Sequence, residues 1–186
     1  MKSWTTMNRA DIKRSKRLAA VLRHHPESIG IELDRHGWVD VDRLLSALAA
    51  HGSPMTRQDL DRVVTGNDKQ RFEWDLDTDL IRARQGHSVD VDLGLVPVSP
   101  PGVLYHGAPV RVVESILATG IERRGRHHVH LSADPSTAHR VGARRGDHVV
   151  LEVDAARMER DGFTFYRSTN GVWLTDEVPA TYLDQR

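Results

Sequence analysis

Two short basic stretches, VLRHHP at residues 21–26 and GRHHVHL at 125–131, are the parts of this sequence best suited to bind an anion. Arginine is permanently charged and presents a planar fork of donors. Several arginines at one place can therefore hold a phosphate and neutralise the charge that develops during its transfer. Taken singly, each arginine would be an ordinary surface residue or the partner of a carboxylate. The candidates are Arg23, Arg71 and Arg126.

The eleven histidines do not have the spacing of a metal site. Adjacent histidines point in different directions on a helix or a strand, and the chain has no His-Glu-x-x-His segment. His128 and His130 would share one face of a strand, but no third ligand follows. The chain has no cysteine, which excludes thiolate zinc sites and disulfides. We expect no metal, and the missing glycine-rich strand-to-helix turn argues against a doubly wound dehydrogenase.

Composition and charge restrict the partners. The 186 residues are 39% hydrophobic and 28% charged, which is typical of a folded soluble protein. The sequence has no apolar run near the roughly 20 residues of a membrane span, so we expect a cytoplasmic protein with no membrane partner. Basic residues gather at 2–23 and 111–145, although the net charge is zero. Two basic regions suit a polyanionic partner, or they are simply solvated helix faces.

A segment rich in proline and glycine at residues 93–103 divides the chain. Before it, apolar spacing predicts a helix ending near Arg23, a second helix after the N-cap Asp40, and a third helix opened by Thr56 with Asp59. Alternation at Phe72, Trp74 and Leu76, followed by a turn and a return strand, predicts a hairpin. Three helices followed by a hairpin is the order of a winged helix.

After the division, strands and short helices alternate. VLYHG, HVHLS, HVVLEV, GFTFY and GVWLT read as strands, and the last two are joined through RSTNG, where Asn-Gly predicts a hairpin. One helix ends at Gly120, and Asp134-Pro135 begins another. The second half is therefore expected to be a small, strand-rich α+β lobe.

The chain resembles the RNA 2′-phosphotransferases, tRNA-type enzymes that remove an internal 2′-phosphate with NAD. The resemblance runs from Lys16 to Leu183 and is carried by motifs in a fixed order: LRHHPESIGIELDRHGWVDVDRLL, NDKQRF, IRARQGHS, LYHG, GRHHVHLS and NGVWLTDEVPATYL. It implies an α+β fold with a winged-helix RNA-binding lobe at 1–95, a linker at 96–102, and an ADP-ribosyltransferase-like NAD-binding lobe with a small mixed or antiparallel β core at 103–186.

The resemblance also implies which residues do the chemistry. The family's essential arginines and histidine fall on Arg23, His24, Arg71 and Arg126. Its NAD-site positions fall on His106, Gly107, Ala108, His130, Ser132 and Val172. We expect guanidinium groups from both halves around one phosphate, beside a dinucleotide pocket. His24 would position the phosphate and assist proton transfer.

The implied reaction has two steps and consumes NAD as a co-substrate. The RNA 2′-phosphate first attacks the anomeric carbon of the nicotinamide ribose and expels nicotinamide. The neighbouring ribose hydroxyl then attacks the phosphorus, which releases RNA with a free 2′-OH and ADP-ribose 1″,2″-cyclic phosphate. The expected partners are NAD and a tRNA-like RNA carrying a 2′-phosphate, and we expect the protein to act as a monomer.

Two positions depart from the family pattern. Ala108 stands where threonine is usual, which removes one hydroxyl contact to the dinucleotide. Arg124 stands where methionine is common, which adds charge two residues before Arg126. Two other functions stay open: an ADP-ribosyltransferase that modifies terminal phosphates of nucleic acids, and a winged-helix RNA-binding protein without catalysis.

Overall fold

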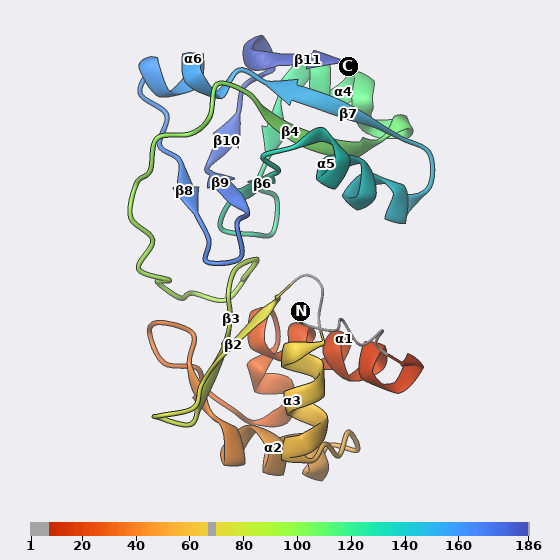
Figure 1. The fold of residues 1–186 in the computed structure, drawn as a ribbon, viewed down its shortest axis with the longest axis vertical. Coiled ribbons are helices and arrows are strands. Elements are labelled where there is room, and N and C mark those ends of the chain that lie inside the picture. Colours follow the sequence, from red (N-terminus) through yellow and green to blue (C-terminus); the bar gives the residue numbers. More distant parts are fainter. Residues whose placement is uncertain (1–7, 67–69, 186) are drawn as a thin grey trace, which may run out of the picture. The chain divides into compact units, whose positions relative to one another are not determined.

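The computed structural model describes residues 8–66 and 70–185, and the chain divides into two units, Met1–Gly94 and Leu95–Arg186. The described residues form a mixed α+β fold with six α-helices and several small antiparallel sheets (Figure 1). None of the helices in the described ranges is long and apolar enough to cross a membrane.

The described residues of the first unit form three α-helices and a three-stranded sheet. Its elements are α1 (Arg9–Arg23), the 3-10 helix η1 (Pro26–Ile29), β1 (Val39–Asp40), α2 (Val41–Ala50), α3 (Arg57–Thr65), β2 (Phe72–Asp75) and β3 (Leu80–Ala83). The sheet has the order β1-β3-β2 and is antiparallel throughout. Leu18, Leu22, Leu44, Leu48 and Phe72 are among the buried side chains that join the helices to the sheet.

Local signals in the sequence explain where these helices begin and end. Asp40 caps α2 by accepting a hydrogen bond from the backbone N–H of Arg43. Thr56 and Asp59 form a reciprocal capping box at the start of α3, as predicted, and Gly66 ends that helix. Leu76 departs from the predicted alternation, because it lies in the turn after β2 and is 76% exposed.

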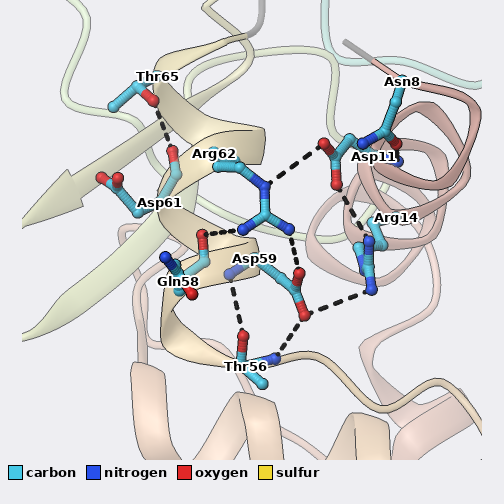
Figure 2. A network of polar contacts seen from close by, with 9 residues as sticks. All are labelled: Asn8, Asp11, Arg14, Thr56, Gln58, Asp59, Asp61, Arg62 and Thr65. Carbon is cyan, nitrogen blue, oxygen red and sulfur yellow. Dashed lines mark hydrogen bonds and ion pairs between the residues drawn. The ribbon is translucent and has the colours of Figure 1, made fainter.

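Two aspartates and two arginines connect α1 to α3 (Figure 2). Asp11, buried in the first turn of α1, pairs with Arg14 at 3.0 Å and with Arg62 of α3 at 3.6 Å. Asp59 of α3 pairs with Arg14 at 3.3 Å and also with Arg62. Part of the basic charge expected at residues 2–23 is therefore neutralised inside the unit.

This network predicts an acid-sensitive contribution to stability. Backbone N–H donation from Thr56, together with Arg62 and Arg14, lowers the pKa of Asp59 below its ordinary value of 3.8. Because the folded-state pKa is the lower one, the stabilisation is complete above pH 3.8 and disappears as the pH falls through the folded-state value. Asp59→Asn should cost about 1 kcal/mol at neutral pH and weaken the acid dependence of the urea midpoint.

The matched control is Asp61→Asn, an exposed aspartate on the same helix. At each pH between neutral and about pH 2, the urea midpoint of this variant should equal that of the unmodified chain. The same acid dependence in Asp59→Asn as in the unmodified chain would show that the network does not contribute in this way.

The second unit, over its described residues, is built from three small antiparallel sheets and three α-helices. The strands pair in the orders β11-β7-β4, β6-β9-β8 and β10-β5. Two of the helices, α4 and α5, pack against the first of these sheets (Figure 1). The elements are β4 (Leu104–Pro109), α4 (Val110–Thr119), β5 (Ile121–Glu122), β6 (Val129–Leu131), α5 (Pro135–Gly142), the 3-10 helix η2 (Ala143–Arg145), β7 (His148–Val153), α6 (Ala155–Arg160), β8 (Tyr166–Arg167), β9 (Trp173–Thr175), β10 (Glu177–Val178), the 3-10 helix η3 (Ala180–Tyr182) and β11 (Leu183–Gln185).

The segment 96–102, expected as a linker, is hydrogen-bonded to the second unit. The backbone N–H of Val98 donates to the carbonyl of Phe165 at 2.9 Å, and the carbonyl of Gly102 accepts from Ala156 at 3.1 Å. Pro97 also forms an isolated bridge with Tyr166. Its backbone therefore adds to the second unit.

Candidate functional site

Arg23 and His24 lie where α1 ends. Arg23 is the last helical residue, and His24 caps the helix by donating its backbone N–H to the carbonyl of Ala20. His25 also bonds to Ala20, and Pro26 then begins η1. Proline disfavours helical backbone in the residue before it, so the helix ends at this point. The paired basic side chains thus extend from a helix terminus and are both partly buried.

The segment after β3 holds this helix end. The backbone N–H groups of Ser88 and Val89 donate to the carbonyl of Arg23 at 2.8 and 3.3 Å. The Ser88 hydroxyl lies 2.9 Å from Nδ1 of His24. Gln85 and His87 of the QGHS motif are buried in the first unit, and Ser88 is exposed. Residue types and spacing did not single out Ser88, because it is 64 residues from its partner.

Arg71 stands directly before β2, as the sequence predicts, while residues 67–69 of the NDKQRF motif lie outside the described residues. Its carbonyl accepts a hydrogen bond from the backbone N–H of Arg84 at 2.9 Å. Gln70 has a left-handed backbone, with φ +41°, which fixes the direction of the chain before Arg71.

The segment from Arg84 to Ser88 is hydrogen-bonded to both predicted arginines of the first unit. The backbone N–H of Arg84 binds the carbonyl of Arg71, and that of Ser88 binds the carbonyl of Arg23. Four residue steps span at most roughly 14 Å when fully extended. The backbones of Arg71 and Arg23 are thus both held by residues 84–88.

In the second unit, Arg126 and two histidines form a chain of contacts. Nη1 of Arg126 lies 3.2 Å from Nδ1 of His130, and Nδ1 of His106 lies 3.1 Å from the carbonyl oxygen of His130. A guanidinium only donates, so Nδ1 of His130 accepts. A carbonyl only accepts, so Nδ1 of His106 carries the proton and its Nε2 is the acceptor in the neutral ring.

Ser132 and Val172 lie close to these histidines. Ser132 exchanges two backbone hydrogen bonds with Tyr105, at 2.9 and 2.8 Å, which places it beside His106. In the antiparallel pair of β6 with β9, Leu131 faces Trp173. The next step of that register would place Val172 opposite Ser132. His106, His130, Ser132 and Val172 thus belong to one neighbourhood.

Gly107 and Ala108 are held by packing. Ala108 is buried in the apolar core of the second unit, where it pairs with Val149 of β7. At Gly107 the backbone of α5 approaches so closely that a Cβ would lie 2.2 Å from the carbonyl oxygen of Ala138 and 2.9 Å from the nitrogen of Gly142. The glycine in LYHG therefore allows α5 to lie directly on β4.

This close approach predicts a large loss of stability in Gly107→Ala. The atoms that would clash belong to the backbone of α5 and cannot move aside as a flexible side chain can, so we expect a cost of about 3 kcal/mol. Chemical denaturation measures it. Gly102→Ala is the matched control, since a Cβ there meets nothing within 4 Å. Equal denaturation midpoints for the two variants would refute the close packing of α5.

His128 lies two residues before His130 in the sequence but has a different environment. Burial lowers its pKa below the ordinary value of 6.5, and the Asp176 carboxylate 3.9 Å away opposes the shift. Its ring packs edge-on against Tyr166, with the ring centroids 5.4 Å apart. His128 is therefore neutral at neutral pH. In the described part of the chain, no group of three or more histidines and carboxylates is placed to hold a metal ion.

A cavity of about 780 Å³ lies elsewhere in the second unit, between α5 and β7. His139 and His148 meet there, with Nδ1 of His139 2.9 Å from Nε2 of His148. None of the predicted site residues lines this cavity. Its lining consists of Pro135, Ser136, His139, Arg140, His148, Val149 and Val150.

A family model and similar proteins all indicate the same family. The model of the family described as "RNA 2′-phosphotransferase, Tpt1 / KptA family" matches residues 9–177. A protein of Streptomyces coelicolor named "Probable RNA 2′-phosphotransferase" is 56% identical over 172 residues, which cover 92% of this chain and 93% of that protein. One of the same name from Nostoc punctiforme is 53% identical over 174 residues, covering 94% of this chain and 96% of the relative.

The match extends over nearly the whole chain and includes both groups of predicted site residues. The chain belongs to the RNA 2′-phosphotransferase family.

Proposed function

We propose that this protein removes an internal 2′-phosphate from RNA by transferring it to the ADP-ribose part of NAD. The products would be RNA with a 2′-OH, nicotinamide and ADP-ribose 1″,2″-cyclic phosphate. The observation that carries the proposal is the family match over residues 9–177. The order of elements in the first unit, three helices and a hairpin, supports a winged-helix lobe that binds the RNA.

The polar groups of the second unit fit a dinucleotide. His106 presents Nε2 as an acceptor because its Nδ1 is bonded to the His130 carbonyl at 3.1 Å. Ser132 offers a hydroxyl beside it, and Arg126 offers a permanent positive charge. We assign binding of NAD to the neighbourhood of His106, His130, Ser132 and Val172. When bound, NAD supplies the ribose carbon that accepts the phosphate and the nicotinamide that leaves.

The remaining residues of the site would act on the phosphate. Arg23 and Arg71 would bind its oxygens through charged donors, and we assign Arg126 to the same phosphate. A phosphate oxygen is already ionised near neutral pH, so the attack needs positioning more than a general base. Val172, which stands where many protein ADP-ribosyltransferases carry glutamate, is compatible with this chemistry. His24 would orient the phosphate and pass a proton to the departing 2′ oxygen.

A direct assay tests the proposal. The purified chain is incubated with NAD and an oligonucleotide carrying one internal 2′-phosphate, and the products are identified by mass. The expected products are nicotinamide, the cyclic phosphate and dephosphorylated oligonucleotide in equal amounts. A stable ADP-ribosylated oligonucleotide would instead identify an ADP-ribosyltransferase. An unchanged mixture, with RNA bound to the protein, would identify an RNA-binding protein without catalysis.

A further inference from the structure

We propose that Ser88 is a positioning residue that fixes the imidazole of His24, so that Nε2 of His24 always faces the phosphate. The inference rests on the proposed function in one respect, that His24 takes part in the reaction. Ser88 itself acts through His24 and has no assigned contact with substrate.

The contact is made by side chain and backbone together. Ser88 Oγ lies 2.9 Å from Nδ1 of His24, and the backbone N–H of Ser88 donates to the carbonyl of Arg23 at 2.8 Å. The same residue therefore holds the end of α1 and the ring that follows it. His87, the preceding residue, is fully buried and packs beside Gly37. The anchor for Ser88 is thus set firmly in the first unit.

The hydroxyl proton has a second acceptor. Ser88 Oγ is 3.5 Å from the carbonyl oxygen of Arg23, to which it donates. A serine hydroxyl has one proton to donate and lone pairs to accept with. With its proton turned toward the Arg23 carbonyl, Oγ accepts from Nδ1–H of His24. This assigns the proton of neutral His24 to Nδ1 and the lone pair to Nε2.

This orientation of the hydroxyl is compatible with both protonation states of the ring. In the charged imidazolium both nitrogens donate, so Nδ1–H can keep its bond to Ser88 while Nε2 gains or loses its proton. The opposite orientation, with the hydroxyl donating to Nδ1, would break each time the ring was protonated. A histidine that shuttles a proton through Nε2 therefore benefits from an acceptor at Nδ1.

Ser88→Ala tests the proposal in the full-length chain. Nitrogen-15 NMR of the imidazoles, with His24→Gln to assign the signals, reports which nitrogen of neutral His24 is protonated. We expect the Nδ1–H form to lose population, because water alone favours Nε2–H. We expect kcat to fall about two- to tenfold, the range for one lost hydrogen bond, with an unchanged KM for NAD. Ser88→Thr, which keeps the hydroxyl, should restore both measurements.

Two controls separate positioning from a general structural effect. Ser28→Ala removes another exposed hydroxyl nearby, one that donates to the His25 carbonyl at 2.6 Å, and should change neither measurement. Adding Ser88→Ala to His24→Ala should cause no further loss of activity, because Ser88 acts only through that ring.

An unchanged tautomer in Ser88→Ala, or a changed tautomer with unchanged kcat, would overturn the proposal. The NMR measurement needs no substrate. It therefore decides the contact even if the unmodified chain fails to turn over 2′-phosphorylated RNA, a result that would count against the proposed function alone.

Discussion

Arg71→Ala is expected to lose ~10²–10³-fold in the rate of 2′-phosphate removal, the effect typical of removing one preorganised charged donor from a developing negative charge. Arg71 stands directly before β2, where the left-handed backbone of Gln70 sets its direction and Arg84 holds its carbonyl at 2.9 Å. The position of its backbone therefore does not depend on its side chain. NAD affinity, followed by calorimetry, should be unchanged, because the NAD-binding residues that we assign belong to the second unit.

The comparison variant is Arg43→Ala, an exposed arginine of α2 in the same unit. It removes the same charge from the same unit and should keep full activity. If Arg71→Ala turned over RNA at the rate of Arg43→Ala, Arg71 would have no part in phosphate binding. Unchanged far-ultraviolet circular dichroism of Arg71→Ala would show that its loss of activity does not come from unfolding.

Arg126→Ala is expected to have an effect of the same size, ~10²–10³-fold. Arg126 is exposed and donates to Nδ1 of His130 at 3.2 Å, so its removal deletes a positive charge and this hydrogen bond. Arg126→Lys should restore little activity, because a lysine ammonium is a point charge without the planar fork of a guanidinium. Arg111→Ala, an exposed arginine on α4, is the matched control and should remain active.

The time course of this variant shows which step Arg126 serves. Nicotinamide and dephosphorylated RNA are measured in the same reaction. Loss of both would place Arg126 at the departure of nicotinamide, whereas nicotinamide release without free 2′-OH RNA would place it at the later cleavage from RNA. Full activity of Arg126→Ala would remove it from the site.

The elements that were predicted correctly have signals within a few residues. The capping box of Thr56 and Asp59 is such a case, since its two hydrogen bonds join residues three apart. The RSTNG segment forms a hairpin between β8 and β9, as predicted. The hydrogen bond from Gly171 to the Ser168 carbonyl and φ +83° at Gly171 make a three-residue loop with glycine in the left-handed position.

Other elements depend on contacts that no local pattern carries. The helix α6 (Ala155–Arg160) was not predicted, because its six residues bury only Ala155 and Met158 and give too short a period to recognise. Strands of two residues, such as β1 and β5, exist only through their partners β3 and β10. The same limit applies to Leu76, whose apolar side chain fits an alternating pattern but is exposed in a turn.

In the candidate site, too, some features could be predicted from local sequence and others could not. Arg23 and Arg71 were selected by residue type and motif, and the structure places them at the end of a helix and the start of a hairpin. The motifs could not reveal what holds them. Ser88 contacts His24 across 64 positions, and the chain of contacts from Arg126 through His130 to His106 depends on the bridge between Tyr105 and Ser132. Such contacts come from tertiary packing, not from periodicity.

The central claim is that the RNA phosphate is transferred intact to ADP-ribose and is not hydrolysed. An oligonucleotide whose 2′-phosphate carries oxygen-18 at its three non-bridging positions tests it directly. Incubated with this protein and NAD, it should yield ADP-ribose 1″,2″-cyclic phosphate containing all three labelled oxygens, with no labelled inorganic phosphate. Labelled inorganic phosphate with NAD left intact would contradict the account.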